Sequence, residues 1–139
     1  MKKRHVNVSG LIYQTENNES AEFYSTGHLR TENGKKILSY SGVFDDDDVT
    51  EIEYDDKSVL MKIESKDKEV PGGAILFQEG KVYSSYHVTP AGILNVEVLP
   101  TLINVTEEED SGKIELSYIS YIGDMHSTNK MEISYKYSN

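Results

Sequence analysis

The chain has 139 residues, of which 37% are hydrophobic, and it carries a formal net charge of −10 and no cysteine. The absence of cysteine excludes disulfide frameworks, thiolate zinc sites and cysteine nucleophiles. The negative charge argues against binding to nucleic acid or to an anionic membrane surface, because both need several Lys or Arg side chains on one surface.

Strand-favouring residues dominate the chain, with 11 Val, 11 Ile and 10 Tyr against 3 Ala. In chain order, the pattern predicts short strands that alternate apolar and polar residues, and no helix, because no segment keeps a 3.6-residue period. Gly10 interrupts the alternation of the first strand, which predicts a bulge or a bend there. The predicted strands are residues 6–13, 22–29, 36–43, 50–54, 59–64, 74–77, 82–88, 94–98, 101–105, 114–118 and 131–137.

Short turns connect these strands. Asn33-Gly34 favours a tight hairpin, since both residues tolerate a positive φ. About ten strands joined by short turns predict an all-β fold, an up-and-down antiparallel meander that closes into a barrel of about 8–10 strands, because closure removes exposed sheet edges. No linker and no internal repeat divides residues 1–139, which predicts a single domain. Further turn signals stand at residues 55–57, 79–80, 90–92 and 110–112.

The N-terminus lacks the pattern of a signal peptide. Lys2, Lys3 and Arg4 are followed by an apolar run of only three residues, 11–13, before Gln14. No window approaches the roughly 18 apolar residues of a membrane-spanning helix. We therefore expect a cytoplasmic protein.

Two acidic runs, residues 45–48 and 107–110, are candidate cation sites, because hard cations such as Ca²⁺ take oxygen ligands. The first run lacks the Gly and Glu positions of the EF-hand loop. Charged runs on solvated turns are the more common arrangement. We therefore expect no metal site and no cofactor.

Catalytic patterns are also missing from the sequence. The four histidines, His5, His28, His87 and His126, are far apart, and no spacing brings two of them onto one element. None of the 15 serines lies in a Gly-x-Ser-x-Gly elbow. Because no nucleophile, base and orienting group can be assembled, an enzyme is not expected.

Tyrosines are the most distinctive inward-facing candidates. Ser84 has the same phase as the tyrosine that follows two residues later. Inside a barrel, tyrosine hydroxyls either line a cavity for one small ligand or fill the interior and bond to backbone carbonyls or water. The alternation places five of them on inward faces: Tyr40, Tyr54, Tyr86, Tyr118 and Tyr135.

Several short phrases occur together in the chain. They are FYSTG at residues 23–27, LSY at 38–40, TPAG at 89–92 and a long tail at 112–135. Together they resemble the YwiB-like family of small uncharacterised bacterial proteins, and the resemblance covers nearly the whole chain in order. It implies a calycin-like β-barrel, similar in shape to lipocalins and fatty-acid-binding proteins, with no established activity.

The sequence departs from that family pattern at three places. Ser41-Gly42 follow the LSY phrase where an acidic residue is usual, Lys62 stands where Arg is usual, and Glu64 stands where Gly is usual. If those positions form a polar site in relatives, this chain lacks the usual residues for it.

Two hypotheses of function follow. The first is a non-catalytic binding module that takes a small, partly apolar molecule into the barrel mouth, with a wall formed by Tyr40, Ser84, Tyr86 and Tyr118. The second is an interaction protein with a filled barrel that binds a protein partner through its outer face or its acidic loops, for which the net charge of −10 suits a basic surface. A monomer and a homodimer both agree with the pattern, since an unclosed barrel edge can pair across a two-fold axis.

Overall fold

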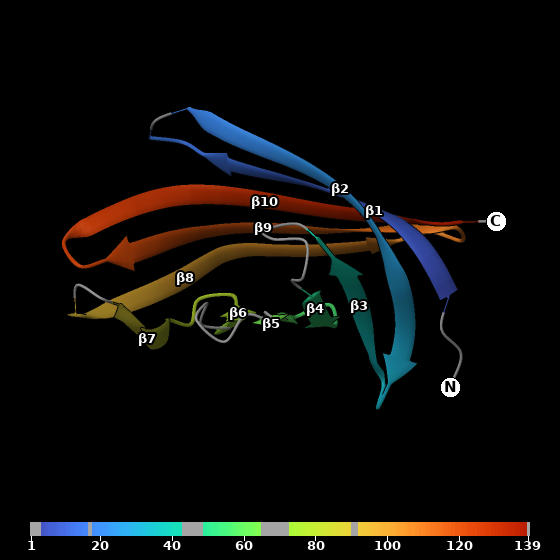
Figure 1. Ribbon diagram of the computed structural model, residues 1–139, viewed down its shortest axis with the longest axis horizontal. Coiled ribbons are helices and arrows are strands. Elements are labelled where there is room, and N and C mark those ends of the chain that lie inside the picture. Colours follow the sequence, from blue (N-terminus) through green and yellow to red (C-terminus); the bar gives the residue numbers. More distant parts are fainter. Residues whose placement is uncertain (1–3, 17, 43–48, 65–72, 90–91, 139) are drawn as a thin grey trace.

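The computed structural model describes residues 4–16, 18–42, 49–64, 73–89 and 92–138. These residues form ten strands and no helix, which confirms the predicted all-β fold (Figure 1). It follows that this part of the chain contains no helix long and apolar enough to cross a membrane. The strands are β1 (Arg4–Gln14), β2 (Glu19–Glu32), β3 (Lys35–Ser41), β4 (Val49–Tyr54), β5 (Ser58–Glu64), β6 (Gly73–Gln78), β7 (Tyr83–Thr89), β8 (Gly92–Glu107), β9 (Ser111–Ile122) and β10 (Met125–Tyr137).

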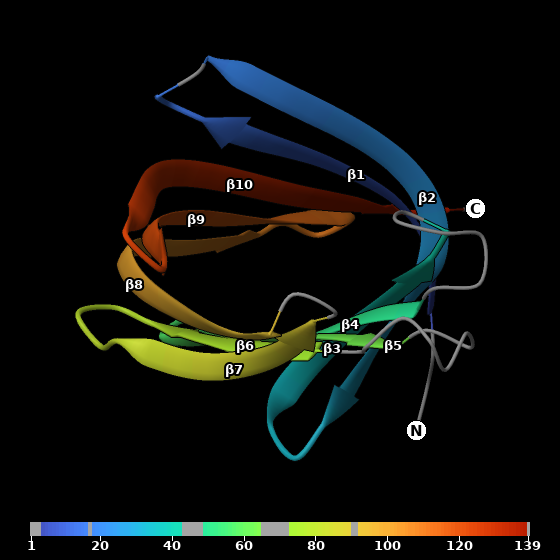
Figure 2. The same ribbon diagram turned by 60° about the vertical axis from the view of Figure 1, so that its left-hand side comes forward.

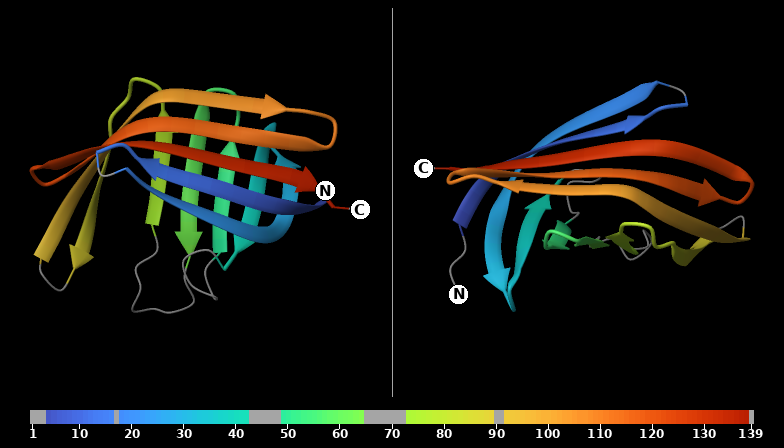
Figure 3. Two further views of the ribbon diagram at one scale, coloured as in Figure 1. Left: turned by 90° about the horizontal axis from the view of Figure 1, so that it is seen from above. Right: turned by 180° about the vertical axis from the view of Figure 1, so that it is seen from behind.

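All ten strands belong to one antiparallel sheet, in the order β6-β5-β4-β3-β2-β1-β10-β9-β8-β7. Strands that are neighbours in the chain pair with each other, apart from β6 and β7, which form the two edges, while β1 also pairs with β10. The predicted meander is therefore confirmed. Seen from above, β3 to β6 run across beneath β1, β8, β9 and β10, and β2 bends from one layer to the other (Figure 3).

The barrel is nearly closed, because its two edge strands come together although no backbone ladder joins them in the described ranges (Figure 2). The Tyr83 hydroxyl of β7 donates to the backbone oxygen of Ala74 in β6, at 3.0 Å. Just after β6, the Glu79 carboxylate accepts a hydrogen bond from the backbone nitrogen of Ile103 in β8, at 2.7 Å. Side-chain contacts of this kind hold the edges together in place of a ladder.

Two predictions about glycine have opposite outcomes. The Asn33-Gly34 hairpin is confirmed, since φ is 53° at the first residue and 78° at the second. Of the bulge or bend predicted at Gly10, the bulge is wrong, because the pairing of β1 with both neighbours continues through this residue. A Cβ at Gly10 would lie 2.0 Å from Cε1 of Phe23, so glycine leaves room for a ring that packs across the strand.

The sequence predicted separate strands at residues 94–98 and 101–105, whereas β8 runs through both. A register shift next to Pro100 places Thr101 as an extra residue in β8. A bulge is one of the few positions at which a strand tolerates proline. The extra residue also changes the phase, so apolar residues on both sides of it face the core.

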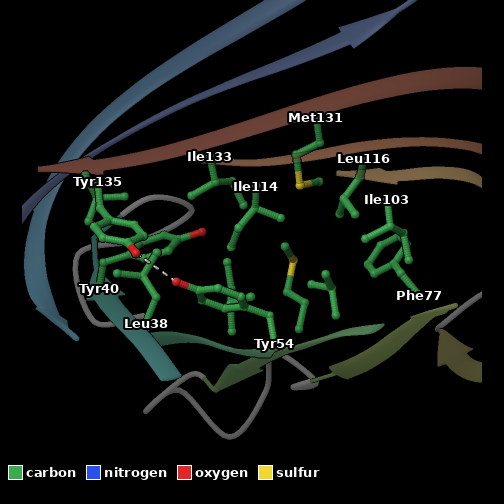
Figure 4. Close-up of a cluster of buried hydrophobic side chains, with 14 of the residues drawn as sticks. Leu38, Tyr40, Tyr54, Phe77, Ile103, Ile114, Leu116, Met131, Ile133 and Tyr135 are labelled. Atoms are coloured by element: carbon green, nitrogen blue, oxygen red, sulfur yellow. Dashed lines mark hydrogen bonds between the residues drawn. The ribbon is translucent and has the colours of Figure 1, made fainter. Parts of the chain in front are cut away.

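Side chains fill the interior where the two layers cross (Figure 4). They are the inward-facing members of the alternating segments, as the period of two predicts. The buried cluster consists of Val6, Val8, Leu29, Leu38, Tyr40, Ile52, Tyr54, Val59, Met61, Phe77, Val98, Ile103, Ile114, Leu116, Met131, Ile133 and Tyr135.

Candidate functional site

The inward-facing residues of β9 and β10 pass from buried to exposed along each strand. In β9, Leu116 is 1% exposed and Ile122, on the same face, is 43% exposed. In β10, Ile133 is 1% exposed and Met125 is 77% exposed. The left panel of Figure 3 shows the reason: the ends of β8, β9 and β10 at the left of that view extend beyond β6. One end of the sheet therefore has an uncovered inner face.

We call this uncovered inner face the mouth. The strand register arranges its residues in rows, because directly paired residues of an antiparallel ladder face the same side. Moving outward from the core, the rows of β10 and β9 are Asn129 with Tyr118, Ser127 with Ser120, and Met125 with Ile122. On β8 the rows continue with Pro100, Val98 and Val96.

Asn129 is a polar residue at the border between the core and the mouth, and it is 8% exposed. Its amide nitrogen donates to the Ser120 hydroxyl at 3.0 Å and to the Ser127 backbone oxygen at 3.2 Å. The two serine hydroxyls are 2.7 Å apart. The amide oxygen of Asn129 has no hydrogen-bond partner among the residues that the structure describes. Within the described part of the chain, this buried acceptor therefore lacks the partner that such a group normally has.

Tyr118 pairs with Asn129 and forms the inner wall of the mouth. Its ring meets the Phe77 ring edge to face, with 5.2 Å between the centroids. Burial raises the pKa of the Tyr118 hydroxyl. Within the described ranges this hydroxyl makes no hydrogen bond, so it adds a second unused polar group beside the first.

At the opposite end of the barrel, polar side chains are paired with one another. The Tyr54 hydroxyl donates to the Tyr135 hydroxyl at 3.1 Å (Figure 4). Lys36 points inward from β3 and forms an ion pair with Glu107. Burial acts to lower the pKa of Lys36, but the bond to Glu107 and the nearby phenol of Tyr135 outweigh it, so the pKa is raised.

The structure separates the residues predicted to form one wall. Tyr40 lies inside the filled core, where its ring stacks on Phe23 at 5.5 Å between centroids and burial raises its pKa. Tyr118 lies at the mouth, on the other side of the core. These two tyrosines are therefore not brought together.

Ser84 does not have the inward orientation that the sequence suggested. It is exposed and pairs with Glu97, on the face opposite to Val98. The backbone of Tyr86 pairs with Asn95, and its side chain lies outside the described part. Residues 82–88 carry aromatic or β-branched side chains in both phases, so alternation could not decide which phase faces inward.

The raised pKa values of four inward-facing tyrosines lead us to expect that the protein unfolds at alkaline pH. Burial raises the pKa of Tyr40, Tyr54, Tyr118 and Tyr135 above the value of about 10 for an unfolded chain. Their contribution to stability is present below about pH 10 and is lost as the pH rises through the folded pKa values. We expect tyrosinate absorbance from these residues and loss of the β-sheet circular dichroism in one transition above pH 10. Ionisation of all tyrosines with an intact dichroism spectrum would contradict this prediction.

A separate groove of about 680 Å³ lies on the outer face of the sheet. It crosses β2, β1, β10, β9 and β8, and its lining includes Ser9, Ser134 and Lys113. The Tyr24 ring stands at its edge and is largely exposed. The size of the groove falls in the range of small-molecule sites, so the outer face is the second place where a partner can be held.

The candidate cation sites gain no support. Residues 45–48 lie outside the described ranges, and Glu107 of the second run is engaged with Lys36. No group of three or more His, Asp or Glu side chains suited to a metal ion occurs in the described part. His5 and His28, which are far apart in the sequence, are cross-strand neighbours with ring centroids 6.5 Å apart.

Sequence reasoning did not single out Asn129 or Lys36, and it considered Glu107 only as part of an acidic run. Each has the phase of an inward-facing apolar series, Asn129 before Met131 in β10 and Glu107 after Val105 in β8. A polar residue in the apolar phase is the signal that could have marked all three. This signal does not distinguish a residue that forms an ion pair, such as Lys36, from one whose acceptor lacks a partner in the described part of the chain, such as Asn129.

The comparisons with known proteins agree on the fold. The family model described as a domain of unknown function, DUF1934, matches residues 6–133. The crystal structure of the YwiB protein from Bacillus subtilis is similar to this chain with a TM-score of 0.77 and 20% sequence identity, over 99% of this chain and 92% of that chain. No curated protein matches the chain. Because the family model spans most of the sequence, the chain belongs to the DUF1934 family, the YwiB-like family that its motifs resemble.

Proposed function

We propose that the protein is a non-catalytic binding module that holds a small, partly apolar molecule at the mouth of its calycin-like barrel. The proposal rests on the hydrogen bonding of Tyr118 and Asn129. Both have a polar atom without a partner in the described part of the chain, at the point where the filled core ends. Buried polar groups are normally paired, so an unpaired one calls for a partner that the described residues do not supply, and a bound ligand is such a partner.

The surroundings suit a ligand that is apolar over most of its surface. Val98 is buried beside the two polar residues, and Ile122 and Met125 remain exposed further out. Large exposed apolar side chains that gather on one face favour association with an apolar partner. The filled core argues for a ligand that lies against the mouth, because Tyr40 and its neighbours leave the centre of the barrel occupied.

Native mass spectrometry of protein purified under mild conditions tests the proposal. We expect a discrete extra mass that disappears on denaturation. In a Ser127→Phe variant, a ring fills the mouth and the extra mass should be lost. Ser134→Phe is the matched control, because Ser134 lies on the outer face of the same strand.

Retention of the extra mass by Ser127→Phe would contradict binding at the mouth. A wild-type protein that carries no extra mass and also gives no fluorescence response with the neutral dye N-phenylnaphthylamine would contradict the proposal as a whole. Both variants need a cooperative unfolding transition before they are compared.

The outer groove supports a second candidate, binding of a protein partner. Tyr24 is the most exposed large hydrophobic side chain in the described ranges, at 78%, and exposed tyrosines are common anchors of interfaces. Lys136, in the same groove, has no ion-pair partner among the described residues. A protein that binds the wild type and Thr101→Ala but not Tyr24→Ala would favour this candidate, whereas equal binding to all three would count against it.

A further inference from the structure

We infer that the ligand of the mouth presents a hydrogen-bond donor, an N–H or an O–H, to Asn129 and that it is not an anion. This inference rests on the proposed function and names the chemical class of the ligand. It depends on two properties of the mouth: which atoms of its polar groups are already used, and which charges surround it.

The orientation of the Asn129 amide is determined by its partners. The Ser127 backbone oxygen, 3.2 Å from the amide nitrogen, can only accept a hydrogen bond, so the nitrogen and not the oxygen must face it. The second proton of the same nitrogen is directed to the Ser120 hydroxyl at 3.0 Å. Both donors of the amide are therefore used, and its oxygen is left without a partner among the residues that the structure describes.

The neighbouring hydroxyls do not satisfy that oxygen. Ser120 and Ser127 lie 2.7 Å from each other, so one hydroxyl donates to the other, and both lie on the nitrogen side of the amide. The Tyr118 hydroxyl makes no hydrogen bond with the described residues, and it can donate or accept. The Asn129 oxygen thus requires a hydrogen-bond donor on the ligand, whereas the Tyr118 hydroxyl can pair with either a donor or an acceptor.

The charges around the mouth disfavour an anion. Three carboxylates belong to, or contact, the strand ends that form it: Asp124 lies in the turn between β9 and β10, Glu97 pairs with Tyr121, and Glu16 accepts a hydrogen bond from the backbone nitrogen of Thr128. Hydrogen bonds from Thr128 lower the pKa of Glu16, so this carboxylate is ionised at neutral pH. The net charge of −10 adds to this local excess. A neutral or cationic ligand avoids the repulsion that an anion would meet.

Three related dyes test the inference by fluorescence titration of the full chain. N-phenylnaphthylamine has an N–H donor and no charge, its N-methyl derivative lacks the donor, and anilinonaphthalene sulfonate has the donor and a negative charge. We expect the first dye to bind roughly 3- to 10-fold more tightly than the second, as the loss of one hydrogen bond implies. The sulfonate should bind more weakly than the first dye, and added salt should reduce the difference.

An Asn129→Leu variant removes the acceptor and keeps a similar volume. In this variant the preference for the N–H dye over its N-methyl derivative should disappear, while a Ser117→Ala control, at an outward-facing position of β9, should retain it. Equal affinities of the two neutral dyes for the wild type would overturn the donor requirement and leave the proposed function standing. A sulfonate that binds more tightly than the neutral N–H dye would overturn the exclusion of anions. The absence of binding by all three dyes would count against the proposed function itself.

Discussion

Replacing Gly27 by Ala is expected to lower the free energy of unfolding by about 3 kcal/mol or more. Gly27 lies in β2, the strand that bends between the two layers (Figure 3). A Cβ at this position would lie 1.9 Å from the backbone oxygen of Ser39 in β3. Because that atom belongs to a paired strand, it cannot turn aside as a side chain can, and the β2–β3 ladder would have to shift.

Urea denaturation followed by circular dichroism measures this loss. Thr26→Ala is the matched control, since Thr26 is the preceding residue of the same strand and is exposed. We expect it to change the free energy of unfolding by less than about 0.5 kcal/mol. If the Gly27 and Thr26 variants unfold at the same urea concentration, the close approach of β2 and β3 is not as described.

Replacing Leu38 by Ala is expected to cost about 2–5 kcal/mol, because Leu38 is fully buried and its removal leaves a cavity between the layers (Figure 4). Leu38 pairs with Leu29 on one side and with Ile52 on the other, and all three are buried, so little can collapse into the space. The same urea titration applies.

Leu102→Ala provides the comparison for the same chemical change at an exposed site. Leu102 is 45% exposed and lies beside the bulge of β8. We expect a much smaller loss than at Leu38. Similar losses at the two positions would mean that the interior is not packed as the structure shows.

The strands could be predicted where one face of the segment is clearly apolar. Ile114, Leu116 and Tyr118 alternate with Glu115 and Ser117, and in the structure the first set faces inward. Period-two alternation is a local property, so it can be read from consecutive residues. The meander followed from short turns such as the hairpin after β2, because such turns join only neighbouring antiparallel strands.

The phase of β7 and the bulge of β8 could not be predicted from local alternation. Both depend on how a strand pairs with its neighbour, which is a contact between distant residues. The alternation predicted two separate strands, 94–98 and 101–105, whereas a bulge next to Pro100 joins them in one strand.

The candidate site was predictable only in part, for the same kind of reason. Tyr40 and Tyr118 have similar local patterns, yet one is covered by Phe23 in the core and the other lies where the cover ends. Which inward residues are covered depends on how far each layer extends past the other. Asn129 shows the limit most clearly, because the orientation of its amide depends on partners at two other positions of the hairpin.

The most direct test of binding at the mouth is to map the backbone amide signals of the protein by NMR during titration with N-phenylnaphthylamine. We predict that the largest shift changes fall on the rows around Tyr118, Ser120, Ser127 and Asn129. Changes confined to the outer groove around Ser9 and Ser134, or no changes at saturating dye, would contradict it.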